Sequence, residues 1–127
     1  ARGGVVDMYS ETDLRVNDRS VYQPDLLAYA RGYSHPPPLL LASPPDLIVE
    51  VLSPSTARQD LQTKRAAYER FGVREYWVVD ADRASVQVWR HDGHAYTAAP
   101  CEGNTLASTA IPGFVLDLKP LRRLAGL

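Results

Sequence analysis

Three ionisable residues stand in apolar segments where charged side chains are unexpected: Asp25, Glu50 and Lys64. Burying an unpaired charge is costly, so each of them needs a partner of opposite charge, a bound ion or a route to water. Two carboxylates and one ammonium that meet in one place are a set of groups suited to the hydrolysis of phosphodiesters. The sequence around each residue shows whether they can meet.

Lys64 lies on the apolar side of an expected helix over residues 56–71. Lys64 follows Leu61 by three residues and precedes Tyr68 by four, so it shares their face. The apolar stripe of this helix consists of Ala57, Leu61, Tyr68 and Phe71. A lysine within the stripe faces the sheet that the helix covers. The alternative is a lysine whose stem packs while its ammonium group reaches water.

Glu50 interrupts an apolar run over residues 46–52, which is typical of a strand buried on both faces. Alternation along a strand places Glu50 on one face with Asp46, Ile48 and Leu52. Glutamate is rare in such a strand, and an ion pair with Lys64 would explain both residues without any catalysis. Asp25, within an apolar segment after Pro24, adds a second carboxylate that one lysine cannot neutralise.

A divalent cation would balance the excess negative charge, and oxygen ligands suit Mg²⁺, with Mn²⁺ as a substitute. A bound Mg²⁺ polarises a phosphoryl oxygen and lowers the pKa of an attacking water. A neighbouring lysine would orient that water or stabilise the developing charge. We therefore predict that Asp25 and Glu50 hold the metal and that Lys64 completes the catalytic set.

The elements that must position these residues form a mixed α/β sheet with at least one helix packed on it. A capping box at Thr56 and Gln59 starts the helix, and Gly72 ends it. Asn17-Asp18 predicts a turn, Asp92-Gly93 a hairpin, and residues 120–124 a short helix. The strands are expected at residues 5–9, 13–16, 21–29, 46–52, 75–80, 85–90 and 114–118.

The segments that carry these residues resemble the Uma-two family of bacterial restriction-endonuclease-like proteins, within the PD-(D/E)XK nuclease superfamily. The resemblance rests on Pro24-Asp25, on residues 48–56, on Asp60, Lys64 and Tyr68, and on residues 72–80. It implies a restriction-endonuclease-like mixed β-sheet flanked by helices and Mg²⁺-dependent cleavage of DNA. It also implies that Asp25 and Glu50 are the acidic ligands and that the Val51 carbonyl is a third.

The chain departs from the superfamily pattern in two respects. The pattern has lysine two residues after the acid, where this chain has Leu52, and the resemblance suggests that Lys64 has taken over that role. The family also has an N-terminal stretch with a helix that can carry a further acidic residue. Because the sequence begins after that stretch, we expect residues 1–127 to form one endonuclease-like domain that is truncated at its N-terminus.

Other polar residues have simpler interpretations. Asp46 follows Pro45 but is about 13 Å along the strand from Glu50, too far to share its metal, and is expected to accept backbone hydrogen bonds. Asp60 is expected either on the exposed helix face or in support of the site from outside its ligands. Tyr68 is expected to pack in the core, with a hydrogen bond to the site from below as the alternative role. His91 and His94 flank the hairpin turn, and no further zinc ligand accompanies them.

Composition places limits on the function. The chain has 127 residues, 45% of them apolar, which suffices for one domain with one core. One cysteine, the lack of a secretory signal and the lack of a long apolar run predict a cytoplasmic protein outside the membrane. The net charge of −1 gives no basic excess for nucleic acid. DNA is the predicted partner, and a homodimer that forms through a sheet edge is a further expectation. The alternative function is an inactive nucleic-acid-binding or protein-interaction module on the same fold.

Overall fold

The computed structural model describes residues 7–30, 40–41, 43–52, 61–80, 83, 85–101 and 103–120. Within these ranges the chain forms eleven strands and one helix. The elements are β1 (Asp7–Ser10), β2 (Asp13–Asn17), β3 (Ser20–Tyr22), β4 (Leu26–Tyr29), β5 (Leu40–Leu41), β6 (Leu47–Leu52), α1 (Leu61–Phe71), β7 (Glu75–Asp80), β8 (Ser85–His91), β9 (Tyr96–Ala99), β10 (Thr105–Ala107) and β11 (Val115–Asp117).

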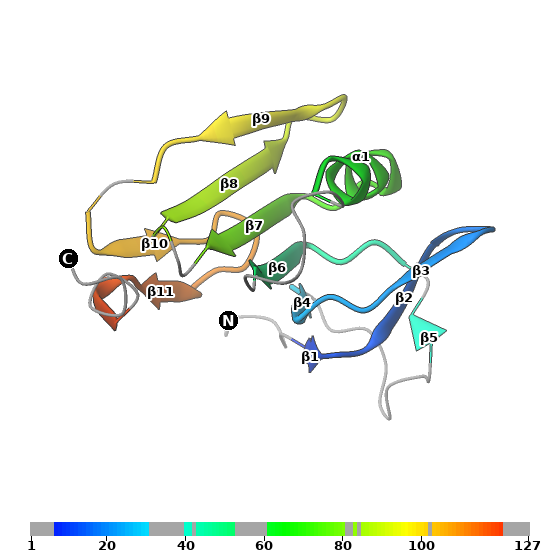
Figure 1. Ribbon diagram of the computed structural model, residues 1–127, viewed down its shortest axis with the longest axis horizontal. Helices are drawn as coiled ribbons and strands as arrows, with labels where there is room; N and C mark the ends of the chain where they lie inside the picture. The colour runs from blue at the N-terminus through cyan, green and yellow to red at the C-terminus, as the bar shows by residue number, and fades with distance from the viewer. Residues whose placement is uncertain are drawn as a thin grey trace.

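A six-stranded sheet in the order β1-β4-β6-β7-β8-β9 forms the centre of the molecule (Figure 1). The central strands β6 and β7 are parallel, whereas every other pair in this sheet is antiparallel. A parallel pair needs a crossover connection, and here that connection contains α1. The arrangement confirms the expected mixed α/β fold.

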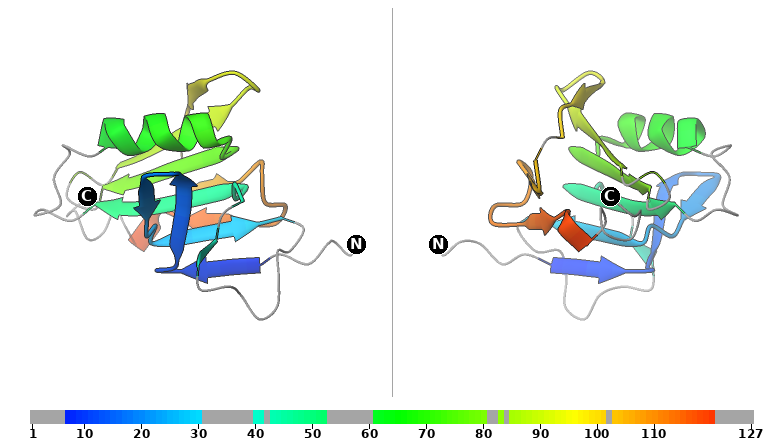
Figure 2. Two further views of the ribbon diagram at one scale, coloured as in Figure 1. Left: turned by 90° about the vertical axis from the view of Figure 1, so that its right-hand side faces the viewer. Right: turned by 60° about the vertical axis from the view of Figure 1, so that its left-hand side comes forward.

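The two faces of the sheet are covered by different elements (Figure 2). Helix α1 packs on one face, and its buried residues Ala67 and Tyr68 join a core with Ile48 and Tyr76. The β10–β11 hairpin contributes Leu106 to a second core on the other face. We call these two sides the helix face and the hairpin face. Both faces of β7 are therefore buried, which fits its place between β6 and β8 within the sheet.

A second, three-stranded sheet in the order β3-β2-β5 lies beside α1. Residues of β2 alternate between exposed and buried, and Leu14 and Val16 point into the core of the helix face. The turn between β2 and β3 lies at the predicted position, with the Asn17 side chain accepting a hydrogen bond from the Arg19 N–H at 2.8 Å.

Helix α1 ends as its sequence predicts. Gly72 has a φ of +93°, a conformation that favours glycine. Its N–H donates to the Tyr68 carbonyl at 3.0 Å, and the Val73 N–H donates to the same carbonyl at 3.1 Å. These bonds satisfy a helix-end carbonyl and turn the chain directly into β7. The predicted capping box at residues 56–59 lies outside the described residues.

One predicted strand was wrong. Residues 21–29 were expected to form a single strand, but they belong to β3 and β4, which lie in different sheets. Pro24 lies between the two strands and lacks the N–H that a continuous ladder would use. Strands β5 and β10 were not predicted, and the expected helix over 120–124 lies almost wholly outside the described residues.

The hairpin between β8 and β9 and the strand β11 lie where the sequence predicts them. The Asp92 carboxylate accepts hydrogen bonds from the N–H groups of His94 and Ala95 at 2.8 and 2.9 Å, which closes the turn at Gly93. No helix in the described part of the chain combines the length and the apolar composition that crossing a bilayer requires.

Candidate active site

Glu50 lies near the carboxyl end of β6, on the helix face of the sheet. Only 7% of its surface is exposed. The antiparallel pairing of β4 with β6 joins Leu26 to Val49, and continuing this register places Asp25 opposite Glu50. Residues directly opposite each other on antiparallel strands present their side chains on the same face. Strand geometry alone therefore brings the two carboxylates together.

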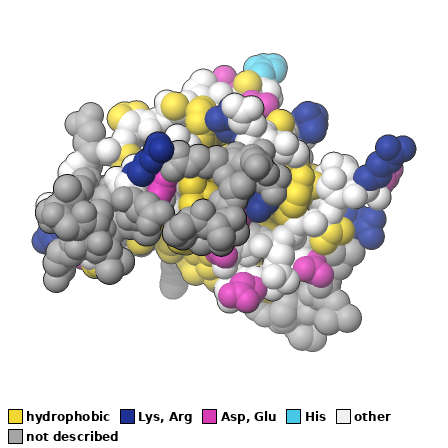
Figure 3. Space-filling view, viewed as in Figure 1, with side chains coloured by type: hydrophobic (Ala, Val, Ile, Leu, Met, Phe, Trp, Pro, Cys, Tyr) yellow, Lys and Arg dark blue, Asp and Glu magenta, His cyan; other side chains and the backbone are white. Residues whose placement is uncertain are grey.

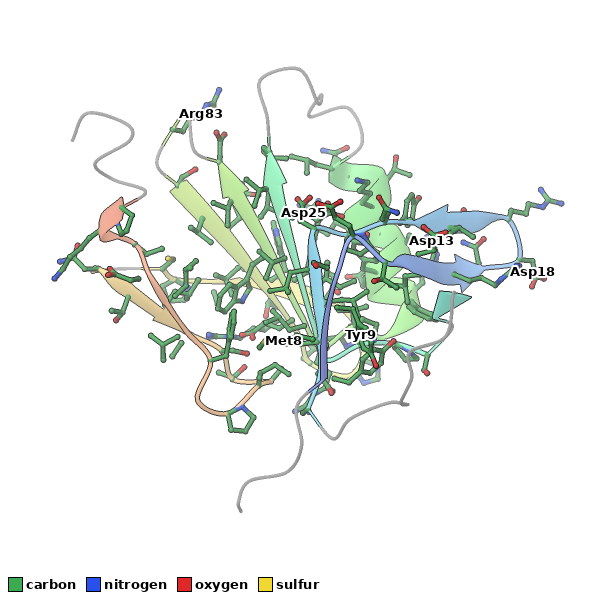
Figure 4. All side chains as sticks on the ribbon, turned by 90° about the horizontal axis from the view of Figure 1, so that it is seen from below. Met8, Tyr9, Asp13, Asp18, Asp25 and Arg83 are labelled. Atoms are coloured by element: carbon green, nitrogen blue, oxygen red, sulfur yellow. The ribbon has the colours of Figure 1, made fainter. Side chains whose placement is uncertain are left out.

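Asp25 precedes the first residue of β4 and is exposed, so the expectation that it lies within a buried strand was wrong. Its Oδ2 atom accepts a hydrogen bond from the Val51 N–H at 2.7 Å. This bond takes the place of the strand pairing that β4 no longer supplies beyond Val49. In Figure 4, Asp25 lies beside the end of β6 and faces α1. The carboxylate is thus held at the mouth of the site.

Lys64 reaches Glu50 from the helix. Its Nζ atom is 3.6 Å from the Glu50 Oε2 atom, and 27% of the lysine side chain is exposed. The ammonium group also lies 5.8 Å from the centre of the Tyr22 ring, at a distance typical of a cation–π contact. The position of Lys64 on the inward stripe, predicted from its spacing, therefore leads to the predicted partner.

Tyr68 contacts the site from the core. Its hydroxyl group donates a hydrogen bond to the Glu50 Oε2 atom at 3.0 Å. Burial raises the pKa of Tyr68, and the negative charge of Glu50 raises it further, so the phenol stays a donor. Tyr68 itself is fully buried and its ring meets those of Tyr22 and Tyr76 edge-on. The Glu50 carboxylate is thus fixed by a donor that has little freedom to move.

The pKa of Glu50 is raised above its ordinary value of 4.5. Burial is the largest cause, since it disfavours the charged form, and the Asp25 charge adds to it. The ion pair with Lys64 and the hydrogen bond from Tyr68 lower the pKa but do not outweigh burial. A second positive charge at this position would favour the carboxylate form.

The oxygen atoms at this site fit a hard divalent cation. Glu50 uses Oε2 for both Tyr68 and Lys64, and Asp25 uses Oδ2 for Val51. Within the described residues, the other oxygen of each carboxylate accepts no hydrogen bond. In a strand, the N–H and C=O of one residue point to the same side, so the Val51 carbonyl faces the side where Asp25 lies. Two carboxylate oxygens and one carbonyl are ligands suited to Mg²⁺.

Across the described residues, no group of three or more His, Cys, Asp or Glu side chains is placed to hold a metal ion. Asp25 and Glu50 supply two such side chains, and the oxygen that accompanies them, the Val51 carbonyl, belongs to the backbone. Mg²⁺ usually keeps several waters and binds one or two carboxylates together with substrate phosphates. Two carboxylates beside a backbone carbonyl fit that mode of binding, and they differ from the cysteine and histidine ligands typical of zinc sites.

The remaining sequence candidates have structural roles or lie outside the described residues. Asp46 accepts a hydrogen bond from the Ala30 N–H at 2.8 Å, which confirms its expected backbone role. His91 contacts the Glu69 carbonyl at 3.0 Å and, through its other ring nitrogen, the Gly93 N–H at 2.9 Å. The histidines thus belong to the hairpin, as expected. Asp60 lies outside the described residues.

Two contributors to the site were not predicted from the sequence. Tyr22 comes from β3, in the other sheet, and supplies the ring beside Lys64. The Val51 N–H orients Asp25 through the backbone. Neither has a local signal in the sequence, because one depends on how the two sheets pack and the other on where β4 ends.

Charged side chains of both signs occur on the face of the molecule that Figure 3 shows. On the face in Figure 3, the described basic and acidic side chains are interspersed and do not gather by sign. This agrees with the net charge of −1. Within the described residues on this face, affinity for a polyanion would have to come from local contacts and bound cations rather than from a broad basic surface.

The chain is similar to known proteins both in sequence and in fold. A sequence model of the Uma2 family, described as putative restriction endonuclease, matches residues 2–119. A crystal structure of a putative nuclease belonging to DUF820 from Anabaena variabilis is similar in fold, with a TM-score of 0.72 and 16% sequence identity. The similarity covers 94% of this chain and 69% of that protein. Comparison with curated proteins gives no match.

Proposed function

Because the chain belongs to the Uma2 family of putative restriction endonucleases, we propose that it is a Mg²⁺-dependent endonuclease that hydrolyses DNA phosphodiester bonds. The observation that carries this proposal is the meeting of three charged side chains from three segments at the end of β6. Glu50 comes from β6, Asp25 from the segment before β4, and Lys64 from α1. Such a set of charges is suited to phosphodiester hydrolysis.

In this proposal the metal is held by the Asp25 and Glu50 carboxylates and the Val51 carbonyl, with Mn²⁺ as a substitute. When bound, the cation would polarise the phosphoryl oxygen and lower the pKa of the attacking water. Its ligands come from β6 and from the segment before β4, which the Asp25–Val51 hydrogen bond ties together, so their spacing would change little as substrate binds. Pre-organised ligands of this kind lower the cost of reaching the reactive geometry.

Lys64 would orient the attacking water or stabilise charge that develops on the phosphate. The ion pair with Glu50 keeps its ammonium group at the site before substrate arrives. The contact with Tyr22 holds the same group from the opposite sheet. A group that is already in place stabilises the transition state without the cost of moving at the moment of reaction.

Tyr68 would act as a positioning residue. Its hydroxyl group fixes Oε2 of Glu50 and so turns the other oxygen toward the side where the metal would bind. Removal of a residue that hydrogen-bonds to a metal ligand and orients it commonly weakens metal binding by about 10- to 100-fold. Asp60, one helical turn before Lys64, is proposed as a further supporting residue on the basis of its spacing.

The test is cleavage of supercoiled plasmid DNA by the purified protein with Mg²⁺ or Mn²⁺. We expect nicked or linear product with the native chain and none with Asp25→Ala or Lys64→Ala. The matched controls are Asp18→Ala, at the exposed tip of the β2–β3 turn (Figure 4), and Lys119→Ala, which is also exposed. Both controls should cleave as the native protein does.

Metal binding supplies a second measurement. Calorimetry should detect Mn²⁺ binding to the native protein and to Asp18→Ala, and a loss of binding in Asp25→Ala. Plasmid that stays intact with either metal, together with tight DNA or protein binding that needs no metal, would instead support the inactive binding module. Cleavage that persists in both Asp25→Ala and Lys64→Ala would assign the activity to other residues.

A further inference from the structure

A pocket lies on the helix face, beside the candidate active site. It has a volume of about 130 Å³ and lies where the start of α1 approaches the carboxyl ends of β6 and β7. Its apolar walls are Leu52, Leu61 and Val78. The candidate metal ligands do not use this space.

The strand register fixes the distance between the pocket and Glu50. Glu50 pairs with Val78, and Val78 pairs with Gln87 on the next strand, so all three share one row. Leu52, Asp80 and Ser85 form the next row on the same face. Asp80 is therefore one strand across and two residues along from Glu50, which corresponds to about 8 Å between the two residues. Consecutive parts of one bound strand of nucleic acid can reach both places.

The polar groups of the pocket favour an uncharged ring with polar edges. Asp80 is 9% exposed, carries a carboxylate and accepts a hydrogen bond from the Arg83 N–H at 3.3 Å. Arg83 and Gln87 also line the pocket. The acid and the guanidinium balance one another formally, so an anion that approaches Arg83 also meets Asp80. The Gln87 amide offers a donor and an acceptor side by side, which suits the edge of a base.

The size of the pocket indicates part of a ligand rather than a whole one. Sites for complete small molecules usually enclose about 300–1,000 Å³, well above the 130 Å³ found here. A planar ring with apolar faces against the leucines and its edge toward Gln87 and Asp80 matches this shape. The rest of the ligand would lie at the metal site, where a phosphate is needed.

We propose that this pocket receives one nucleobase of the DNA strand whose phosphate lies at Glu50. The inference rests on the proposed nuclease function, because that function places a nucleic acid strand at this edge of the sheet. A base in the pocket would be read by hydrogen bonds to Gln87 and Asp80, whereas phosphate contacts alone carry no sequence information. It would also set the register of the scissile phosphate.

The test uses ligands that separate a base from a phosphate. The side-chain amide of Gln87 and the methyl groups of Val78 are followed by NMR while deoxynucleoside 5′-monophosphates are added with Mg²⁺. We expect both signals to shift with at least one of the four nucleotides. Neither should shift with 2-deoxyribose 5-phosphate or with inorganic phosphate, which share the charge but lack the base.

Substitution gives the matched comparison. Gln87→Leu should weaken nucleotide binding by about two- to tenfold, as expected from the loss of one neutral hydrogen bond. Gln62→Leu, the same change at an exposed position of α1, should leave binding unaltered. Equal shifts from the base-free sugar phosphate, or no shift at Gln87 from any nucleotide, would overturn the inference.

The outcome is separable from that of the nuclease proposal. If plasmid is cleaved but no nucleotide shifts the Gln87 signal, the function stands and the base pocket is wrong. If no plasmid is cleaved, the NMR titration still decides whether the pocket selects a base over a sugar phosphate.

Discussion

Tyr68→Phe isolates the hydrogen bond that fixes Glu50, because it removes one oxygen atom and leaves the ring in place. The lost bond runs from a fully buried phenol to a carboxylate at 3.0 Å. Hydrogen bonds to charged groups contribute about 1.5–3 kcal/mol, so we expect the free energy of unfolding to fall by that amount. No large cavity forms, and the loss of the hydroxyl group dominates the effect.

The same substitution should change the titration of Glu50. The bond from Tyr68 lowers the pKa of Glu50 in the native protein, although burial keeps that pKa above its ordinary value. Without the bond, the pKa should rise further, so a larger share of Glu50 is protonated at a given pH. Metal binding needs the carboxylate form, and the pH at which cleavage reaches half its maximum should therefore move upward.

Tyr96→Phe is the matched control. Tyr96 is also buried on the helix face, but its hydroxyl group donates to the neutral Val73 carbonyl at 2.8 Å. We expect a loss of about 0.5–1.5 kcal/mol and no change in the titration of Glu50. Urea unfolding measures the stability of both variants, and carboxyl-selective NMR follows the titration. Identical titration of Glu50 in the native protein and Tyr68→Phe would refute the positioning role of Tyr68.

Two further predictions concern buried acids. Burial raises the pKa of Glu50 above 4.5, so the folded state holds the proton of Glu50 more tightly than the unfolded state does. The contribution of Glu50 to stability therefore falls as pH rises from about 4.5 through the raised value. Glu50→Gln should abolish this part of the pH dependence of stability, as measured by urea unfolding. Burial also acts to raise the pKa of Glu75, but hydrogen bonds from Ser108 and Arg90 outweigh burial and lower the pKa. The contribution of Glu75 to stability is therefore present above the pKa of the unfolded state and is lost as pH falls through the pKa of the folded state. Arg90→Met should lower the free energy of unfolding by about 1.5–3 kcal/mol at neutral pH and move the acid loss of stability to higher pH. Unfolding curves that match those of the native protein from pH 3 to 7 would contradict the role of the Arg90–Glu75 bond.

The sequence predicted the parts of the site that depend on local periodicity. The spacing of Lys64 between Leu61 and Tyr68 placed the lysine on the inward face of α1, and alternation along residues 46–52 placed Glu50 on one face with Ile48. The structure brings these two side chains within 3.6 Å. Both inferences needed only the geometry of one helix and one strand.

The parts that failed depend on pairing between distant segments. Apolar residues continue on both sides of Pro24, so periodicity alone did not reveal that β3 and β4 belong to separate sheets. For the same reason Asp25 was expected to be buried, although β4 begins only at Leu26. The contact of Tyr22 with Lys64 arises between two sheets, and single-strand patterns contain no information about it.

The anchoring of Asp25 through the main chain has a consequence for how position 51 can vary. The Val51 side chain is 52% exposed, whereas its N–H holds the carboxylate. Nearly any amino acid there would preserve that bond, and proline alone would abolish it, since proline has no N–H. Related proteins could therefore carry different residues at this position while the placement of Asp25 still depends strictly on the backbone N–H there.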